Sequence, residues 1–220
     1  MMDMKTKLSI VLTFFALLLH GCGGDSNQAV VTEIGYGELT DNVYTNKYFG
    51  MTVSVPEGWH TQDRQAIEEM NEFGSAAIAG DNETLKAGLE ASEKNTLTLL
   101  SIFEHPVGAP VDFNPNINIV VEKVSQFPGI KTNDDYMFHS KKLLEQAAIP
   151  YTFPKANYDE KIGGLTFRVL ECKADMQGIS LSQGFYATRI KDYMLLIVVS
   201  YTDDAQAQSL NDVLADITFE

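Results

Sequence analysis

The chain has 220 residues, of which 45% are hydrophobic, and a formal net charge of -14 at pH 7. This hydrophobic content is too high for a disordered chain, and the length suffices for one domain with a sizeable core. The excess of acidic residues argues against binding to nucleic acid or to an anionic lipid face.

The first 21 residues are typical of a bacterial secretion signal. Lys5 and Lys7 precede an apolar run over residues 8–19. This run has the length of a signal-peptide core and is too short to cross a bilayer comfortably, which takes about 20 residues. It ends in LHGC at residues 19–22, which resembles the lipobox of bacterial lipoproteins, although His20 is an unusual middle residue.

The lipobox resemblance implies that the chain is cut before Cys22, whose thiol then carries diacylglycerol and whose new amine is acylated. Several acyl chains hold a protein on a membrane where one chain does so only marginally. Residues 22–42 are therefore expected to be the lipidated cysteine and a flexible linker. Gly23 stands where an aspartate favours the inner membrane in enterobacterial lipoproteins, so the outer membrane facing the periplasm is favoured in a cell with two membranes.

Cleavage at this position would leave 14 basic and 29 acidic residues and a net charge near -15. With Cys22 lipidated, Cys172 has no partner for an intramolecular disulfide. Cys172 shares a predicted strand face with Leu170 and Ala174, so we expect a buried, unreactive thiol. The stability of the domain must then come from its hydrophobic core.

The folded domain is expected to span residues 43–220. In YFGMTVSVPEGW at residues 48–59, apolar side chains alternate from Phe49 to Val55 and predict a strand that ends at Pro56 and Gly58. Trp59 follows directly. An aromatic residue at this position either closes the edge of the core or offers a ligand a surface for stacking.

A pair of helices is predicted next. Thr61 is a plausible N-cap for a helix whose apolar positions include Ile67, Met70 and Phe73, and the Gly-Asp-Asn sequence at residues 80–82 ends it. A second helix follows over the region of Leu85 and Leu89. The acidic residues of the first helix lie opposite the apolar stripe and are expected to face solvent.

Two strands and a distinctive loop come after the helical pair. TLTLLSIF at residues 96–103 is apolar on both faces and is expected to be central in a sheet, and INIVVEKV at residues 117–124 predicts a neighbouring strand. The loop at residues 104–116 contains three prolines, so it should be irregular but stiff. Its Glu104, His105 and Asp112 match no ligand spacing and give only a weak metal signal.

The remainder predicts helix, three-stranded meander and helix. Thr132 and Asp135 approximate a capping box for a helix that ends before Pro150. Residues 161–175, 179–190 and 193–201 form apolar runs separated by tight turns, which is typical of adjacent antiparallel strands. A last helix begins at Asp203 or Asp204. The predicted order is β-β, α-α, β-β, α, β-β-β, α.

This order and several segments resemble the PsbP-like superfamily, and within it the bacterial DcrB-type lipoproteins. The segments are YTNKYFGMTVSVPEGW at residues 44–59, the long middle helix, GFYATRIKDYMLLIVVSY at residues 184–201 and LNDVLADITF at residues 210–219. The resemblance implies an α+β fold, an α/β/α sandwich around a mainly antiparallel sheet. It also implies binding, assembly or accessory roles without established catalysis, and it supplies no functional residue that can be carried over.

Motifs for catalysis or cofactors are absent from the sequence: it has no phosphate-binding Gly-rich loop, nucleophile elbow, zinc-protease helix, cysteine pair or calcium loop. We therefore expect a lipid-anchored, non-catalytic module of the cell envelope that binds or assembles with another envelope protein, without cofactor, metal or nucleic acid. One alternative is a small-ligand or metal-ion binder with a cleft near residues 104–116. Another is a hydrolase built from residues far apart in the chain.

A binding patch is predicted where two strand ends could meet. If the strand before Trp59 and the strand before the 104–116 loop are neighbours, then Trp59, His60, His105 and Asp112 would rim one concave patch. The prolines would keep this loop ordered before binding and so lower the entropy cost of association. An aromatic group beside an acidic rim suits a cationic or amphipathic partner.

Overall fold

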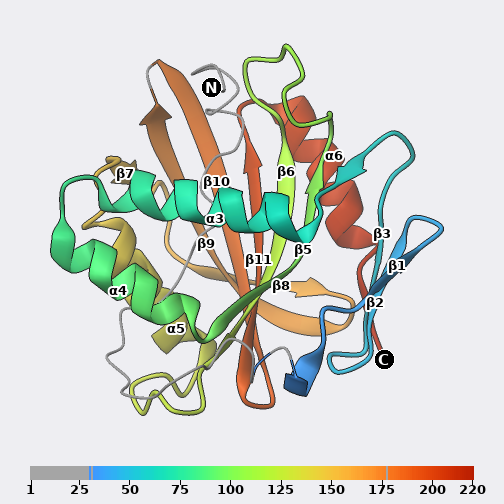
Figure 1. Ribbon diagram of the computed structural model, residues 1–220, viewed down its shortest axis with the longest axis horizontal. Coiled ribbons are helices and arrows are strands. Elements are labelled where there is room, and N and C mark those ends of the chain that lie inside the picture. The colour runs from blue at the N-terminus through green and yellow to red at the C-terminus, as the bar shows by residue number, and fades with distance from the viewer. Residues whose placement is uncertain (1–29, 31, 177) are drawn as a thin grey trace.

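The computed structural model describes residues 30, 32–176 and 178–220. The predicted signal peptide and Cys22 lie outside these residues. The strands and helices, labelled as in Figure 1, follow the chain in this order: β1 (Glu38–Thr40), β2 (Val43–Asn46), β3 (Met51–Ser54), β4 (His60–Thr61), α3 (Arg64–Ala79), α4 (Glu83–Glu93), β5 (Thr96–Phe103), β6 (Asn116–Lys123), α5 (Asn133–Leu144), β7 (Tyr151–Thr152), β8 (Tyr158–Ile162), β9 (Leu165–Met176), β10 (Ile179–Ile190), β11 (Tyr193–Tyr201), α6 (Asp204–Ala215) and β12 (Thr218–Phe219).

A large antiparallel sheet forms the centre of the molecule. Its strand order is β4-β5-β6-β11-β10-β9-β7, and β8 also pairs with β9. The long hairpins of β9, β10 and β11 follow from the tight turns predicted between the apolar runs, and Lys191 takes a positive φ of 55° in the second turn. All strand pairings described in the structure are antiparallel. The predicted α+β class with a mainly antiparallel sheet is confirmed.

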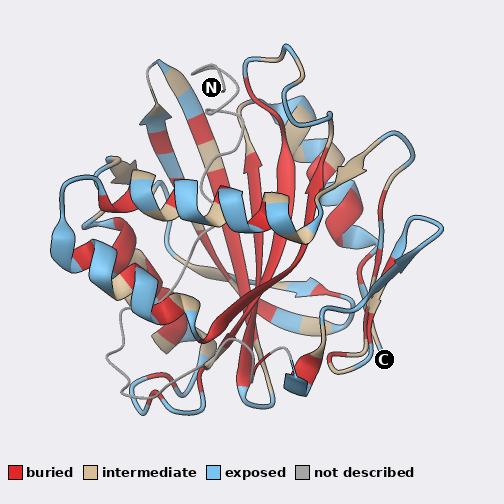
Figure 2. Ribbon diagram, viewed as in Figure 1, coloured by how far each residue is buried: buried red, intermediate tan, exposed pale blue. Residues whose placement is uncertain are grey.

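Helices cover both faces of this sheet. On one face, α5 packs through Tyr136, Met137 and Leu144, while α3 and α4 contribute Ile78 and Leu85. On the other face, α6 packs through its buried leucines and valine. Figure 2 shows the central strands β5, β6 and β11 buried and the outer faces of α3 and α4 exposed to solvent.

A second, four-stranded sheet shares the face with α6. Its order is β1-β2-β3-β12, so the last strand of the chain pairs with one of the first. The β1–β2 turn carries Asp41 and Asn42 with φ of 49° and 62°, a geometry that suits these two residue types in a tight hairpin. One hydrophobic cluster joins both sheets, since Met51 and Val53 of β3 pack with the central strands of the large sheet.

Several local predictions need correction. Asp63, not Thr61, is the N-cap of α3, because Thr61 pairs with β5 as part of β4 and the Asp63 carboxylate accepts a hydrogen bond from the Ala66 backbone. Phe49 and Val55 lie outside the strand, although both are buried. Phe73 is 38% exposed because Gly74 takes the position on α3 that faces the core.

The folded domain also begins earlier than residue 43. Val30 and Ile34 are 1% and 6% exposed and belong to the hydrophobic cluster that joins both sheets, which is the main core. In addition, β1 lies at residues 38–40. In the sequence these two residues stand four positions apart in AVVTEI, which is a helical spacing, but one such pair is too short a pattern to predict a helix. The region expected to be a linker at residues 22–42 therefore includes part of the domain.

Candidate functional site

The strand before Trp59, β3, lies in the small sheet and does not pair with β5; the short strand after Trp59, β4, does. His60 pairs with Phe103, the last residue of β5, and the backbone N–H of Gln62 donates to the carbonyl of Ser101. Trp59 therefore lies beside the point where the loop at residues 104–115 leaves the sheet. The sheet itself brings Trp59, His60 and His105 to one end of the molecule.

The loop at residues 104–115 is held closed at its base. The Asn114 side chain is 1% exposed; its amide donates to the His105 carbonyl at 2.8 Å, and its oxygen accepts from the His105 N–H at 3.0 Å. The Glu104 N–H donates to the Pro115 carbonyl at 3.0 Å. These bonds and the prolines give an ordered loop whose outer part exposes Val107 and Asp112.

A pocket of about 340 Å³ lies between the end of β3, Trp59 and α6, and it is partly open to solvent. Its described lining residues are Ser54, Pro56, Trp59, Ser209, Asp212, Val213 and Asp216. Trp59 is half-buried and packs against the main core, so the same indole both closes the core and lines the pocket. This volume lies at the lower end of the range for small-ligand sites.

The charge of this pocket is concentrated at the end of α6. Asp212 lies in the last turn and Asp216 is the C-cap, and no basic residue occupies the last turn. The C-terminus of a helix carries a partial negative charge, so two carboxylates there repel it and each other. Both carboxylates are exposed, and the indole of Trp59, which lines the same pocket, offers a further attraction for a cation. The arrangement favours a cationic group with an apolar stem.

The four sequence-predicted residues do not share this pocket. Trp59 lines it, whereas His60, His105 and Asp112 are not among its described lining residues. His60 and His105 are half-buried at the same sheet end, and Asp112 is exposed on the loop. Within the described part of the chain, no group of three or more His, Cys, Asp or Glu side chains is placed to hold a metal ion.

Sequence reasoning missed the contribution of α6 and of Asn114. Asp212 and Asp216 are four residues apart at the end of a predicted helix, and no basic residue stands near them in the sequence. This uncompensated pair was the one sequence feature that indicated a negatively charged helix end. These two aspartates are far from Trp59 in the sequence. They lie near it only because α6 packs against the sheet beside Trp59. Asn114 gave no signal beyond that of a turn residue in a proline-rich loop.

No protein-family model and no curated protein matches the sequence. Solved structures with similar chains include cyanobacterial PsbP (CyanoP) of Synechocystis sp. PCC 6803, at 13% identity and a TM-score of 0.48, covering 92% of this chain and 99% of that one. LpqN of Mycobacterium tuberculosis, described as involved in cell envelope biogenesis, is 12% identical with a TM-score of 0.44, covering 76% and 82% of the two chains. A protein of unknown function from Pseudomonas aeruginosa is 14% identical with a TM-score of 0.39, covering 56% and 79%.

These likenesses include the PsbP fold to which the sequence showed a resemblance. The α+β class of the chain rests on its own strand order and helix layers. In the described residues, no helix is long and apolar enough to cross a membrane.

Proposed function

We propose that the protein is a lipid-anchored, non-catalytic module of the cell envelope that binds a cationic segment of another envelope protein. Cys22 carries the lipid, and the outer membrane facing the periplasm is its favoured location. The pocket of Trp59, Asp212 and Asp216 receives a lysine or arginine side chain of the partner. The ordered loop at residues 104–115, with His105 and Asp112, borders the same end of the molecule and extends the contact surface.

One observation carries this proposal: an indole and two carboxylates share an open pocket at the negative end of α6. Each of these three features attracts a cation, and none is compensated by a basic residue in the last helical turn. The net charge near -15 would also draw a cationic partner from a distance. The pocket is partly open to solvent, so a side chain of a bound peptide can enter it.

The binding test uses the soluble chain without its lipid and a short peptide with lysine and arginine side chains, compared with the same peptide carrying glutamine at those positions. We expect measurable binding of the basic peptide alone by calorimetry. The double change Asp212→Asn with Asp216→Asn should weaken it several-fold, since an exposed charge pair contributes up to about 1 kcal/mol. Trp59→Leu should weaken it about tenfold, whereas Trp59→Phe should retain most of the affinity.

A matched control removes two charges elsewhere. Glu68 and Glu72 are exposed on α3, so Glu68→Gln with Glu72→Gln changes the net charge equally without touching the pocket. Equal loss of binding in both double variants would mean that only the net charge matters, and the pocket would have no role. Unchanged binding after Trp59→Leu would likewise exclude it.

The anchor has its own test. Cys22→Ser, or globomycin treatment of cells, should leave an unprocessed or soluble form, and mass spectrometry of the untreated protein should show an acylated Cys22 at the N-terminus. Unchanged membrane fractionation after both treatments would disprove the anchor.

A further inference from the structure

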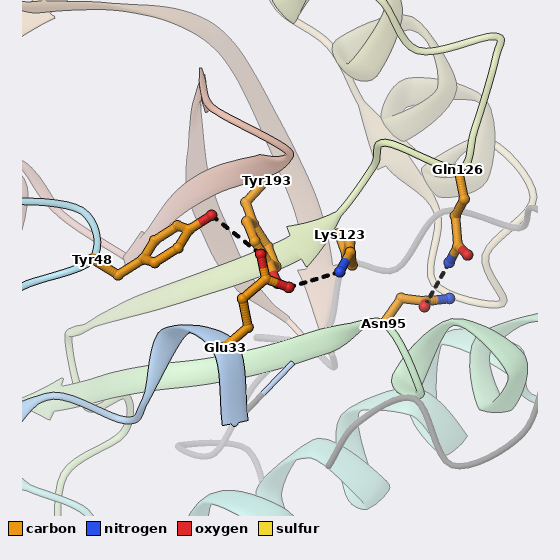
Figure 3. Close-up of polar contacts among 6 residues, drawn as sticks. All are labelled: Glu33, Tyr48, Asn95, Lys123, Gln126 and Tyr193. Carbon is orange, nitrogen blue, oxygen red and sulfur yellow. Dashed lines mark hydrogen bonds and ion pairs between the residues drawn. The ribbon is translucent and has the colours of Figure 1, made fainter. Parts of the chain in front are cut away.

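Glu33 fastens the first described segment to one end of the large sheet. Its Oε2 accepts hydrogen bonds from Lys123 Nζ at 2.7 Å and from Tyr193 Oη at 2.8 Å, and its Oε1 accepts one from Tyr48 Oη at 3.4 Å (Figure 3). Lys123 is the last residue of β6 and Tyr193 the first of β11, and the two are paired in the sheet. The chain therefore enters the domain at this end.

We call this end the anchor end and define it as residues 94–95, 123–132 and 189–193. These segments are joined to each other. The Lys123 N–H donates to the Asn95 carbonyl at 2.9 Å. The Gln126 side-chain amide donates to Asn95 Oδ1 at 2.7 Å (Figure 3). The Val124 N–H donates to the Asp192 carbonyl at 2.9 Å. The anchor end is thus one continuous surface.

Basic residues are concentrated on the anchor end. Its segments contain five basic residues and one acidic residue, Asp192; the basic residues are Lys94, Lys123, Lys131, Arg189 and Lys191. Two further carboxylates contact this end, since Glu33 pairs with Lys123 and Asp135 accepts from the backbone N–H groups of Lys131 and Thr132. The segments at the pocket end and along α6, residues 56–63, 104–115 and 202–216, together contain eight aspartates and glutamates and no lysine or arginine. The charge of this acidic protein is therefore strongly uneven along the strands.

The chain length from Cys22 limits how far this end can be from a membrane. Eight residue steps separate Cys22 from the buried Val30, and at most ~3.6 Å per residue gives a reach of about 29 Å. The β5 strand that separates the anchor end from Trp59 has eight residues, which adds roughly 26 Å at ~3.3 Å per residue. An acyl group on Cys22 would therefore hold the anchor end nearer to the bilayer than the Trp59 pocket.

We propose that the anchor end rests on anionic lipid headgroups, with its basic side chains toward the headgroup phosphates and the Trp59 pocket directed away from the membrane. This inference rests on the acylated Cys22 of the proposed function. The net charge of the whole chain opposes spontaneous adsorption, but once acyl chains hold the domain at the surface, the uneven charge selects the end that faces the lipid. The acidic pocket end is repelled and stays available to its partner.

The test compares single-cysteine probes at the two ends of the acylated protein on vesicles of phosphatidylethanolamine and phosphatidylglycerol. Ser125 at the anchor end and Ala205 on α6 are both exposed, so Ser125→Cys and Ala205→Cys each accept a fluorophore. Cys172 is 1% exposed, and its burial raises the pKa of its thiol far above the ordinary value, so it should not react. We expect spin-labelled headgroups to quench the probe at residue 125 at least twofold more than the probe at residue 205.

Charge variants show whether the basic residues cause the orientation. Lys94→Gln, Lys131→Gln and Lys191→Gln together should abolish the quenching difference, whereas the control Lys86→Gln, Lys142→Gln and Lys173→Gln, which removes exposed lysines outside the anchor end, should preserve it. Equal quenching at both sites, stronger quenching at residue 205, or equal loss in both triple variants would overturn the orientation. An absent acyl group would instead show in the mass spectrum and disprove the anchor, and peptide binding by the soluble chain tests the pocket independently.

Discussion

Two glutamates illustrate how neighbouring groups set the pKa of an acidic side chain in this fold. Hydrogen bonds from Lys123 and Tyr193 lower the pKa of Glu33 below its ordinary value. Burial, followed by the nearby acidic residues Glu90 and Glu72, raises the pKa of Glu93. The folded state thus favours the charged form of Glu33 and the protonated form of Glu93, and the two groups must contribute oppositely to stability at neutral pH.

Glu93→Gln should stabilise the protein at neutral pH. Glu93 is the last residue of α4, where its charge meets the negative helix end, and Gln can still accept the 3.3 Å hydrogen bond from Ser75 Oγ. We expect the free energy of unfolding to rise by about 0.3–1 kcal/mol near pH 7. Because the folded-state pKa is raised, the wild type regains this stability as the pH falls through that pKa, so the gain should vanish near pH 4 in urea unfolding experiments.

Glu33→Gln is the matched control for this measurement. Its lowered pKa means that the charged carboxylate stabilises the folded state above the unfolded-state pKa, and that this stability is lost as the pH falls through the folded-state pKa. The variant should therefore be less stable than the wild type near pH 7 and approach it in acid. A gain in stability at neutral pH from Glu33→Gln, or a loss from Glu93→Gln, would contradict these assignments.

Among the helices, α6 has charges that conflict with its own stability. Its N-terminus follows the usual rules, with Asp203 as N-cap accepting from the Gln206 N–H and Asp204 in the first turn. Its C-terminus does not, because Asp212 and Asp216 lie at the negative end without a basic partner in the last turn. The Asp212 carboxylate accepts a hydrogen bond from Gln208 Nε2 at 2.8 Å, which does not remove the charge conflict at this helix end. Broken local rules often mark functional sites, which agrees with a role for this end in binding.

Asp216→Asn should therefore separate stability from binding. Removal of a carboxylate at the C-cap should raise the free energy of unfolding by about 0.3–1 kcal/mol, while the affinity for the basic peptide falls several-fold. Asp204→Asn is the same chemical change at the other end of α6, where a negative charge is favourable, so it should lower stability by a similar amount and leave peptide affinity nearly unchanged. Urea unfolding and calorimetry on both variants measure the two effects. A stability loss from Asp216→Asn would show that the carboxylate serves the fold.

The elements themselves were largely predictable, because periodicity and capping are local. The capping box of Thr132 and Asp135 and the N-cap at Asp203 are both present in the structure. The predictions were wrong where tertiary contacts determine the local structure. Thr61 pairs with β5 and therefore cannot cap α3. The exposure of Phe73 depends on which side of α3 meets the sheet. The pocket lies beyond local signals, since it joins Trp59 to α6 from residues about 150 positions away in the chain.

At the scale of the whole molecule, the segment that enters the domain is part of the structure that joins its two sheets. Val30 and Ile34 belong to the cluster that contains Tyr44 and Met51 of the small sheet and the central strands of the large one. The Tyr44 hydroxyl donates to the Tyr36 carbonyl at 2.6 Å. The anchor end, the small sheet and the core thus depend on residues that the sequence assigned to a linker.

A chain that begins at residue 30 should consequently be much more stable than one that begins at residue 43. The shorter chain loses the burial of Val30 and Ile34, each contributing about 1.5–3 kcal/mol, together with β1 and the bonds of Glu33. Urea unfolding should show a loss of at least about 3 kcal/mol. If the shorter chain fails to fold, Ile34→Ala in the longer one measures the same contribution, with an expected loss of about 2–5 kcal/mol. A loss below about 0.5 kcal/mol in either comparison would restore the domain boundary at residue 43. It would also mean that Glu33 has no structural role, and the proposed membrane-facing orientation would then lose the fixed attachment on which it depends.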